Sequence, residues 1–275
     1  MKVFISVDME GVACVTHGNH VKLEGNEYEM CRKWMTAEAN AAIEGAFESG
    51  ATEIVVADSH GHMYNMIPDE LHEDVLLVRG SPRPLTMMEG VDETVDAVFL
   101  VGYHSMAGTG KGILAHTYIG SSVYNVRLNG VTVGETGLNA AIAGHFGVPV
   151  ALVCGDDTLD AEVGVLIPTT ERVITKWAIS PTAARNLTPK ASQKKIKTGA
   201  KTALTRLKEM KPYVVEAPIR FEVDFMKPQF AYLASDIPGI ELVDGRTLIY
   251  TGADMLEIAS IWRLIVNASL GNFSV

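Results

Sequence analysis

Cysteine is scarce in this sequence of 275 residues, which contains only Cys14, Cys31 and Cys154. An odd number of cysteines without the spacing of a metal site argues against a disulfide framework and against a cysteine-based zinc site. We therefore expect reduced thiols and a cytoplasmic protein. A catalytic cysteine is the less favoured alternative, because a nucleophilic thiol also needs a nearby base.

Long apolar runs and an excess of positive charge are also lacking. No run approaches the ~18 apolar residues of a membrane span, and Asp8 and Glu10 interrupt the first apolar stretch too early for a secretory signal. The net charge is −10, whereas nucleic acid attracts basic surfaces. We expect neither a membrane nor a nucleic-acid partner, and we interpret the lysines of residues 189–210 as a solvated helix face.

Phosphate-binding motifs are absent from the glycine-rich loop of residues 102–116. A P-loop needs glycine where Ser105 stands, and serine or threonine where Gly112 stands. A dinucleotide fingerprint needs glycine where Ile113 stands. We interpret this segment as a substrate-facing loop, with His116 at its far end returning to a site as acid, base or nucleophile.

The residues that are present indicate a globular protein with a full core, since 47% are hydrophobic and 20% charged. Uninterrupted apolar runs, typical of buried strands, lie at residues 3–7, 53–57, 97–101 and 150–153. A segment with apolar residues at helical spacing, residues 27–49, separates the first two runs. This alternation predicts an α/β fold with a mostly parallel, doubly wound sheet and helices on both faces.

The middle of the chain adds other elements to this pattern. The pair Asn129-Gly130 lies between two strand-like segments and predicts a tight hairpin. A helix is expected at residues 135–146, directly after the hairpin. Ser180 and Thr188 each precede a proline, which predicts two further helix starts, the second helix running to about residue 210.

The last part of the chain has a mixed α+β texture. We expect a strand at residues 219–225, then a helix, two short strands and a final helix at residues 254–270. This change of texture predicts an α/β metal-site domain at residues 1–210. Residues 211–275 are expected to form an α+β extension of it or a small second domain.

Side chains that can bind metal follow the predicted strands. Asp8 and Glu10 come after the first strand, and His60 and His104 come after the next two. Because the carboxyl ends of parallel strands meet at one edge of a sheet, we expect these side chains to lie together. Imidazole with carboxylate suits zinc and similar ions, so the sequence predicts a divalent-metal site at this edge.

Each of these residues also has a purely structural interpretation. A histidine at a strand end is often only a hydrogen-bonded partner, and Glu10 could lie in solvent. We interpret Asp58, Asp156 and Asp157 as helix N-caps or as partners of the ligands rather than as ligands. Glu135 is either a further ligand or a first-turn glutamate that the helix dipole favours.

Six short motifs occur in order from the first predicted strand to the fourth. They are SVDMEG (6–11), DSHG (58–61), GYHS (102–105), AHT (115–117), NGVTVGETGLNAAIAG (129–144) and VCGDD (153–157). Together they resemble the DppA-type D-aminopeptidases, which form the M55 family of zinc metallopeptidases. Weaker similarity continues through residues 180–191 and 253–257, so the resemblance covers most of the chain.

The resemblance implies a dinuclear zinc centre with two ions per subunit. By motif, Asp8 would bridge the two ions. Glu10 and His60 would complete one zinc site. His104 and Glu135 would complete the other. The bound metal would then neutralise the paired carboxylates that follow the first strand.

The resemblance also implies an activity, namely release of N-terminal residues, preferably D-amino acids, from short peptides by a ring-like homo-oligomer. His116 would serve as general base, as activating group or as nucleophile. Residues 105–111 and 14–26 differ from the family pattern, and loops of this kind shape substrate pockets. Two alternatives stay open: another metal-dependent amidohydrolase on the same scaffold, and a non-catalytic peptide-binding protein with structural metals.

Overall fold

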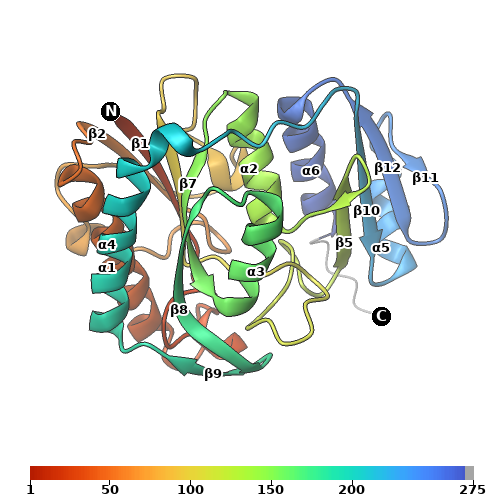
Figure 1. Cartoon of the computed structure of the whole chain (residues 1–275). Coiled ribbons are helices and arrows are strands. Elements are labelled where there is room, and N and C mark those ends of the chain that lie inside the picture. The colour runs from red at the N-terminus through yellow and green to blue at the C-terminus, as the bar shows by residue number, and fades with distance from the viewer. Residues whose placement is uncertain (270–275) are drawn as a thin grey trace.

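The computed structural model describes residues 1–269 and is built around a seven-stranded sheet, sheet A (Figure 1). All neighbouring strands of sheet A run parallel except the last two, β8 and β9. In spatial order the strands are β3 (Leu76–Val78), β2 (Glu53–Asp58), β1 (Lys2–Val7), β4 (Ala97–Val101), β7 (Val150–Asp156), β8 (Glu171–Ser180) and β9 (Ala183–Asn186).

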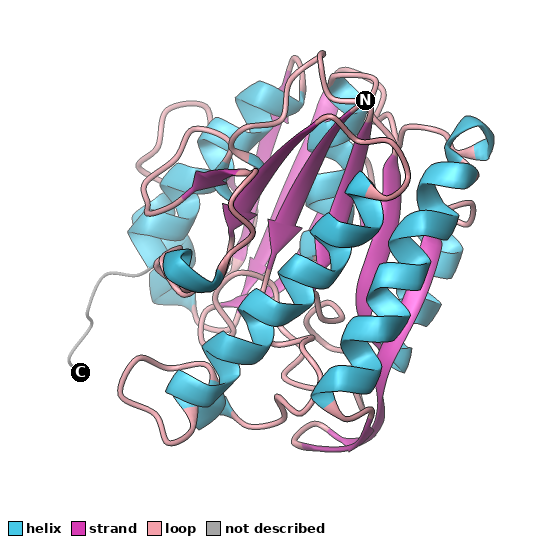
Figure 2. Cartoon of the chain, turned by 90° about the vertical axis from the view of Figure 1, so that its left-hand side faces the viewer, coloured by secondary structure: helices cyan, strands magenta, loops and turns pink. Residues whose placement is uncertain are grey.

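Helices cover both faces of sheet A, as the apolar runs predict. The helices α1 and α4 pack against each other on one face, where Figure 2 shows them side by side across the strands, and α2 and α3 lie on the other face. Alternate residues of β1 serve the two sides, since Phe4 belongs to the core beneath α2 and Ile5 to the core beneath α1. Burial on both faces explains why the strands are continuous apolar runs. The bounds are α1 (Tyr28–Phe47), α2 (Glu135–His145), α3 (Asp157–Leu166) and α4 (Pro189–Thr205).

A second, antiparallel sheet, sheet B, continues the core on the α2 side. Its strands β5 and β6 form the predicted hairpin, with Asn129 and Gly130 both at positive φ, as a tight hairpin turn requires. Because β5 pairs with β10, sheet B contains strands from both sides of residue 210. The domain boundary expected at this residue stays a prediction. The elements of this part are β5 (Val123–Leu128), β6 (Val131–Thr132), β10 (Ile219–Phe225), α5 (Pro228–Ala234), β11 (Glu241–Leu242), β12 (Thr247–Gly252) and α6 (Met255–Ser269).

The structure departs from the expected elements in a few places. The predicted helix start at Ser180 is wrong, because Ser180 ends β8 and the chain turns at Pro181 into β9. Proline suits the second position of such a turn as well as the first turn of a helix. The helix that begins at Pro189 ends at Thr205, short of residue 210, and the expected end of the last helix at residue 270 lies outside the described residues.

Some elements of the described residues were not expected from the sequence. The strands β3, β8 and β9 were not predicted. None of the described helices is long and apolar enough to cross a membrane. Single turns of 3₁₀ helix lie at Gly18–His20, Pro68–Glu70, Thr86–Met88 and Leu207–Glu209.

Candidate metal centre

The loops after β1, β2 and β4 meet at the carboxyl edge of sheet A, because β1 pairs with β2 on one side and with β4 on the other. A Cβ atom on Gly102 would lie 2.2 Å from the carbonyl oxygen of Asp8. A Cβ atom on Gly11 would lie 1.8 Å from the carbonyl oxygen of Tyr103. Only glycine fits at these two positions, and Gly102 also has a φ of +72°. The close approach brings the side chains of the two loops into one site.

The five predicted ligands lie together at this edge. The Nδ1 atom of His60 is 3.3 Å from Asp8 Oδ1 and 2.9 Å from Glu10 Oε2. The Nε2 atom of His104 is 3.4 Å from Asp8 Oδ2 and 3.4 Å from Glu135 Oε1. The two oxygens of Asp8 thus face different histidines, with Asp8 in the middle of the group. That these residues bind metal stays a prediction.

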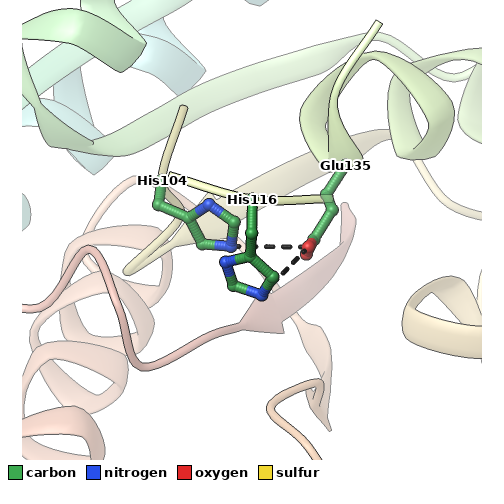
Figure 3. Close-up of side chains that lie close together, drawn as sticks. All are labelled: His104, His116 and Glu135. Atoms are coloured by element: carbon green, nitrogen blue, oxygen red, sulfur yellow. Dashed lines mark ion pairs between the residues drawn. The ribbon is translucent and has the colours of Figure 1, made fainter. Parts of the chain in front are cut away.

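His116 lies beside this group at the end of the loop that follows β4. Its ring stacks on the ring of His104, with centroids 4.2 Å apart and an interplanar angle of 9° (Figure 3). Its Nε2 atom is 3.7 Å from Glu135 Oε1. The side chain of His116 is 22% exposed, whereas that of His104 is 2% exposed. His116 is therefore the member of this pair that a molecule entering from solvent can reach.

Backbone carbonyl groups determine which nitrogen of each histidine faces the site. A carbonyl oxygen can only accept a hydrogen bond, so the ring nitrogen beside it must carry the proton. The opposite nitrogen then points into the site, where it can bind a cation or accept a proton. The three bonds run from His60 Nε2 to Val21 O at 2.8 Å, from His104 Nδ1 to Ser105 O at 3.0 Å, and from His116 Nδ1 to Leu114 O at 2.8 Å.

The site concentrates negative charge that no lysine or arginine of residues 1–269 neutralises. Asp8, Glu10 and Glu135 are 2%, 5% and 4% exposed. Among residues 1–269, no lysine or arginine pairs with any of their carboxylates within 4.0 Å. Burial, together with the neighbouring Glu10 carboxylate, raises the pKa of Asp8 to about 7. Three buried carboxylates so close together require an added positive charge.

The two buried histidines supply part of that charge as protons. Burial opposes protonation of His104, but the carboxylates of Glu135, Asp8 and Glu10 together outweigh burial and the pKa of His104 rises to about 10. Burial likewise opposes protonation of His60, yet Glu10 holds its pKa well above the ordinary value. For His116, burial lowers the pKa and the adjacent His104 lowers it further. Without metal, protons on His60 and His104 therefore supply positive charge that bound metal would otherwise provide.

Unpartnered polar atoms test whether a divalent cation suits the site. Asp8 Oδ2, Glu10 Oε2 and His104 Nε2 are buried without a hydrogen-bond partner among the described residues. Glu10 Oε2 is close to His60 Nδ1, but the contact lacks hydrogen-bond geometry. The ligand atoms of Asp8, Glu10 and His104 all lie within 4.8 Å of one another. Carboxylate oxygens and imidazole nitrogens at such spacing fit zinc, which satisfies orphaned atoms of both kinds.

The aspartates interpreted as N-caps have different roles. Asp156 caps α3 by accepting a hydrogen bond from the Leu159 backbone N–H at 2.8 Å. Asp58 precedes no helix and instead accepts hydrogen bonds from the backbone N–H groups of Asn65 and Met66. It thereby orders the loop that carries His60. The N-cap prediction is also wrong for Asp157, which is the first residue of α3 and accepts from the Ala178 backbone N–H at 2.7 Å.

Lys176 is a supporting residue that the sequence did not reveal. It lies on β8, is fully buried, and its Nζ atom donates to the carbonyl oxygens of Glu10, Val12 and Val15. The ammonium group therefore fixes the backbone of the loop after β1. A lysine among the apolar residues of ERVITKWAIS is the signal that could have pointed to it.

A cavity of about 570 Å³ gives access to the site. Its walls include the carboxylates of Asp8, Glu10 and Glu135 and the ring of His116. Residues 21–24 form part of the rim, and the carbonyl of Val21 in this segment is the one that orients His60. The segment that departs from the family pattern thus lies directly over the predicted ligands.

Comparison with known proteins gives concordant matches over nearly the whole chain. The family model Peptidase_M55, described as D-aminopeptidase, matches residues 1–264. A D-aminopeptidase of Bacillus subtilis (strain 168) is 36% identical over 258 residues, which cover 94% of this chain and 93% of that protein. A solved structure, described as the Zn-dependent D-aminopeptidase DppA from Bacillus subtilis, a self-compartmentalizing protease, is 33% identical with a TM-score of 0.97, and the match covers 100% of both chains.

Proposed function

Because this chain belongs to the M55 family of D-aminopeptidases, we propose that it is a zinc-dependent aminopeptidase that releases N-terminal amino acids, preferably of D configuration, from short peptides. The observation that carries the proposal is the set of buried, unpartnered carboxylate and imidazole atoms around one open cavity. A site of this kind is costly unless a cation completes it.

We assign the ligands of two zinc ions to five residues. Asp8 would bridge the ions, which is supported by its two oxygens facing His60 and His104 separately. Glu10 would join His60 at one ion, and Glu135 would join His104 at the other. When bound, zinc supplies Lewis-acid polarisation of a carbonyl and a water of lowered pKa.

His116 is assigned the proton transfers of the reaction. Its Nδ1–H is held by the Leu114 carbonyl, so its Nε2 atom faces the cavity as an acceptor. A group there can take a proton from the attacking nucleophile and return it to the departing amine. The neighbouring Glu135 carboxylate, 3.7 Å away, stabilises the ring once it is protonated. Direct nucleophilic attack by Nε2 is the alternative role.

Assembly and location are also part of the proposal. The similar DppA is described as self-compartmentalizing. We infer a ring-like homo-oligomer in which small peptides reach the sites from an enclosed space. Light scattering of the purified protein tests this inference, and a monomer in solution contradicts it. A cytoplasmic location is proposed from the scarcity of cysteine.

The test of the activity compares D-Ala-D-Ala with L-Ala-L-Ala on protein stripped by chelator and then reloaded with zinc. We expect two zinc ions per subunit by elemental analysis and zinc-restored release of alanine from the D-peptide. Cleavage of the L-peptide alone would keep the aminopeptidase and remove the stereochemical preference. Reloaded protein that cuts neither peptide would contradict the proposal.

A pair of histidine variants tests the role of His116. His116→Ala is expected to keep both zinc ions and lose turnover by about 100-fold or more, the scale of general acid–base catalysis. His145→Ala is the matched control, because His145 is exposed at the end of α2. Full turnover of His116→Ala would remove His116 from the mechanism.

A further inference from the structure

A second cavity adjoins the metal-site cavity. Its volume is about 250 Å³, and it shares Gly61, Met63 and Tyr118 with the larger cavity as common walls. Tyr118 joins the two: its backbone N–H donates to Glu135 Oε1 at 2.7 Å, and its hydroxyl lies 2.8 Å from Thr86 Oγ1 in the wall of the second cavity. One tyrosine side chain therefore separates a predicted metal ligand from this second space.

Two arginines line the second cavity, and each has a buried N–H group without a partner. Arg83 is 6% exposed and its Nη1 atom makes no hydrogen bond within the described residues. Arg263, on α6, has a buried Nε atom that likewise lacks a partner there. They belong to elements 180 residues apart in the chain and converge only in the fold.

The remaining contacts of Arg83 hold its guanidinium in place without neutralising it. Its Nε and Nη2 atoms donate to backbone carbonyls of Gly80, Val78 and Met63. Asp58 and Glu89 attract Arg83 electrostatically, but both carboxylates already accept backbone N–H groups. In residues 1–269, no carboxylate lies within 4.0 Å of either arginine.

A buried cation without a counter-ion is unfavourable, and its empty donors specify what completes it. The guanidinium group matches a carboxylate in shape and charge. The substrates of an aminopeptidase carry a carboxylate at the end opposite the scissile bond. Two extended residues span ~7 Å, which suits a short peptide with its N-terminal end in one cavity and its C-terminal end in the adjoining one.

We propose that Arg83 and Arg263 form a subsite for the C-terminal carboxylate of the substrate, so that the enzyme selects free peptides of two or three residues. This inference rests on the proposed aminopeptidase function and adds the end of the substrate that it recognises. Chain length is then set by the distance from the metal centre to the two arginines. Longer peptides and peptides with a blocked C-terminus lose the contact.

The test compares D-Ala-D-Ala with D-Ala-D-Ala amide, which differ only at the carboxylate. For the zinc-loaded wild type, we expect kcat/KM to be about 10–100-fold higher for the free acid, the scale of a charged hydrogen bond. Arg263→Met should lower kcat/KM for the acid about 10-fold and leave the amide within about twofold. Arg263→Lys keeps the positive charge but loses the planar guanidinium, so its kcat/KM for the acid should lie between those of the wild type and Arg263→Met.

Arg246→Met is the matched control, since it removes the same charge at an exposed turn before β12. Its ratio of acid to amide should equal that of the wild type. Equal cleavage of acid and amide by the wild type, or an equal loss on both in Arg263→Met, would overturn the subsite while leaving the aminopeptidase intact. If the wild type cuts neither compound, the proposed function fails and the subsite fails with it.

Discussion

Two regions of this molecule bring carboxylates together, and they neutralise them in different ways. In sheet B, Asp224 receives two hydrogen bonds from Arg127, at 2.8 and 3.0 Å. At the carboxyl edge of sheet A, Asp8 lies among two glutamates and two histidines, and no lysine or arginine pairs with it within 4.0 Å in residues 1–269. Sheet B carries its own cation, whereas the carboxylates at the edge of sheet A face only histidines, and we propose that bound zinc completes this site.

The pKa values of the two aspartates show the consequence. Burial acts to raise the pKa of Asp224, but Arg127, Thr247 and Asn125 together outweigh burial and its pKa is lowered. Burial and the neighbouring Glu10 together raise the pKa of Asp8 to about 7. The same residue type therefore stabilises one region in its charged form, and we expect it to destabilise the other unless a cation binds.

Asp8→Asn gives the largest effect and breaks this comparison most directly. Zinc-loaded activity should fall more than 100-fold, because even partners outside the metal ligands cost ~10–100-fold when removed. In the presence of chelator, however, the variant should unfold at a higher temperature than the wild type, since it removes a buried carboxylate from a group of three that two protonated histidines neutralise only in part. Turnover of the zinc-loaded proteins measures the first effect, and thermal unfolding with and without chelator measures the second. A chelated variant less stable than the chelated wild type would contradict the comparison.

Lys176→Met tests the support behind the site. Three buried carbonyl oxygens, those of Glu10, Val12 and Val15, would lose their donor. We expect a loss of ~3–5 kcal/mol in the free energy of unfolding and a ~10–100-fold weaker zinc affinity, because the Glu10 loop is no longer held. Denaturant unfolding and zinc titration measure the two effects.

Lys195→Met is the control for the lysine variant. Lys195 also donates to a backbone carbonyl, that of Ile174 at 3.1 Å, but it does so at the surface. Its removal should change stability by less than ~0.5 kcal/mol. If both lysine variants lost the same free energy of unfolding, the burial of Lys176 would not account for its contribution to stability.

The sequence predicted the sheet A region better than the surroundings of its site. The apolar runs identified β1, β2, β4 and β7, and the rule for strand ends predicted that Asp8, Glu10, His60 and His104 would lie together. The strand β8 was missed because Glu171, Arg172 and Lys176 interrupt its apolar pattern. The strand lies next to the edge strand β9, and its Lys176 is buried because it donates hydrogen bonds to the loop after β1.

Other parts of the site depend on contacts that no local pattern encodes. His116 and Glu135 reach the ligands from a loop and from a helix start, so the residues alone offered them only as candidates, and the family resemblance assigned their parts in the site. The hydrogen bond from His60 to the Val21 carbonyl joins residues 39 positions apart. The tertiary fold is likewise needed to bring Arg83 and Arg263 to the wall of one cavity, since neither residue lies in a recognisable motif.

Glu38 sharpens the comparison with a third way to neutralise a buried carboxyl, which is to keep its proton. It is 1% exposed and accepts hydrogen bonds from Ser192 Oγ at 2.7 Å and from the Ala13 backbone N–H at 3.1 Å. Burial raises its pKa from 4.5 to about 7. Between these values the unfolded chain loses the proton while the folded chain keeps it, so stability falls as pH rises.

Glu38→Gln removes this pH dependence. The free energy of unfolding of the wild type, relative to that of the variant, should fall by about 3 kcal/mol between pH 4.5 and pH 8. Denaturant unfolding of both proteins across this range measures the difference. A difference that stays constant with pH, or that grows in favour of the wild type, would show that Glu38 is ionised in the folded protein.

Arg127→Met gives the smallest effect, because the ion pair of sheet B is partly open to solvent. The side chains of Arg127 and Asp224 are 23% and 21% exposed, and Asp224 keeps a hydrogen bond from Thr247 Oγ1 at 3.0 Å. We expect a loss of ~1 kcal/mol and a Tm lower by ~2–4 °C, with zinc content and turnover unchanged.

A double-mutant cycle with Asp224→Asn separates the pair from its surroundings. The coupling between Arg127 and Asp224 should be no more than ~1 kcal/mol and should not change when zinc is removed. At the edge of sheet A the opposite holds, since the effect of Asp8→Asn is expected to change sign between the chelated and the zinc-loaded protein. A zinc-dependent coupling in sheet B would mean that the two regions are not independent, and that the cation bound at one sheet also stabilises the other.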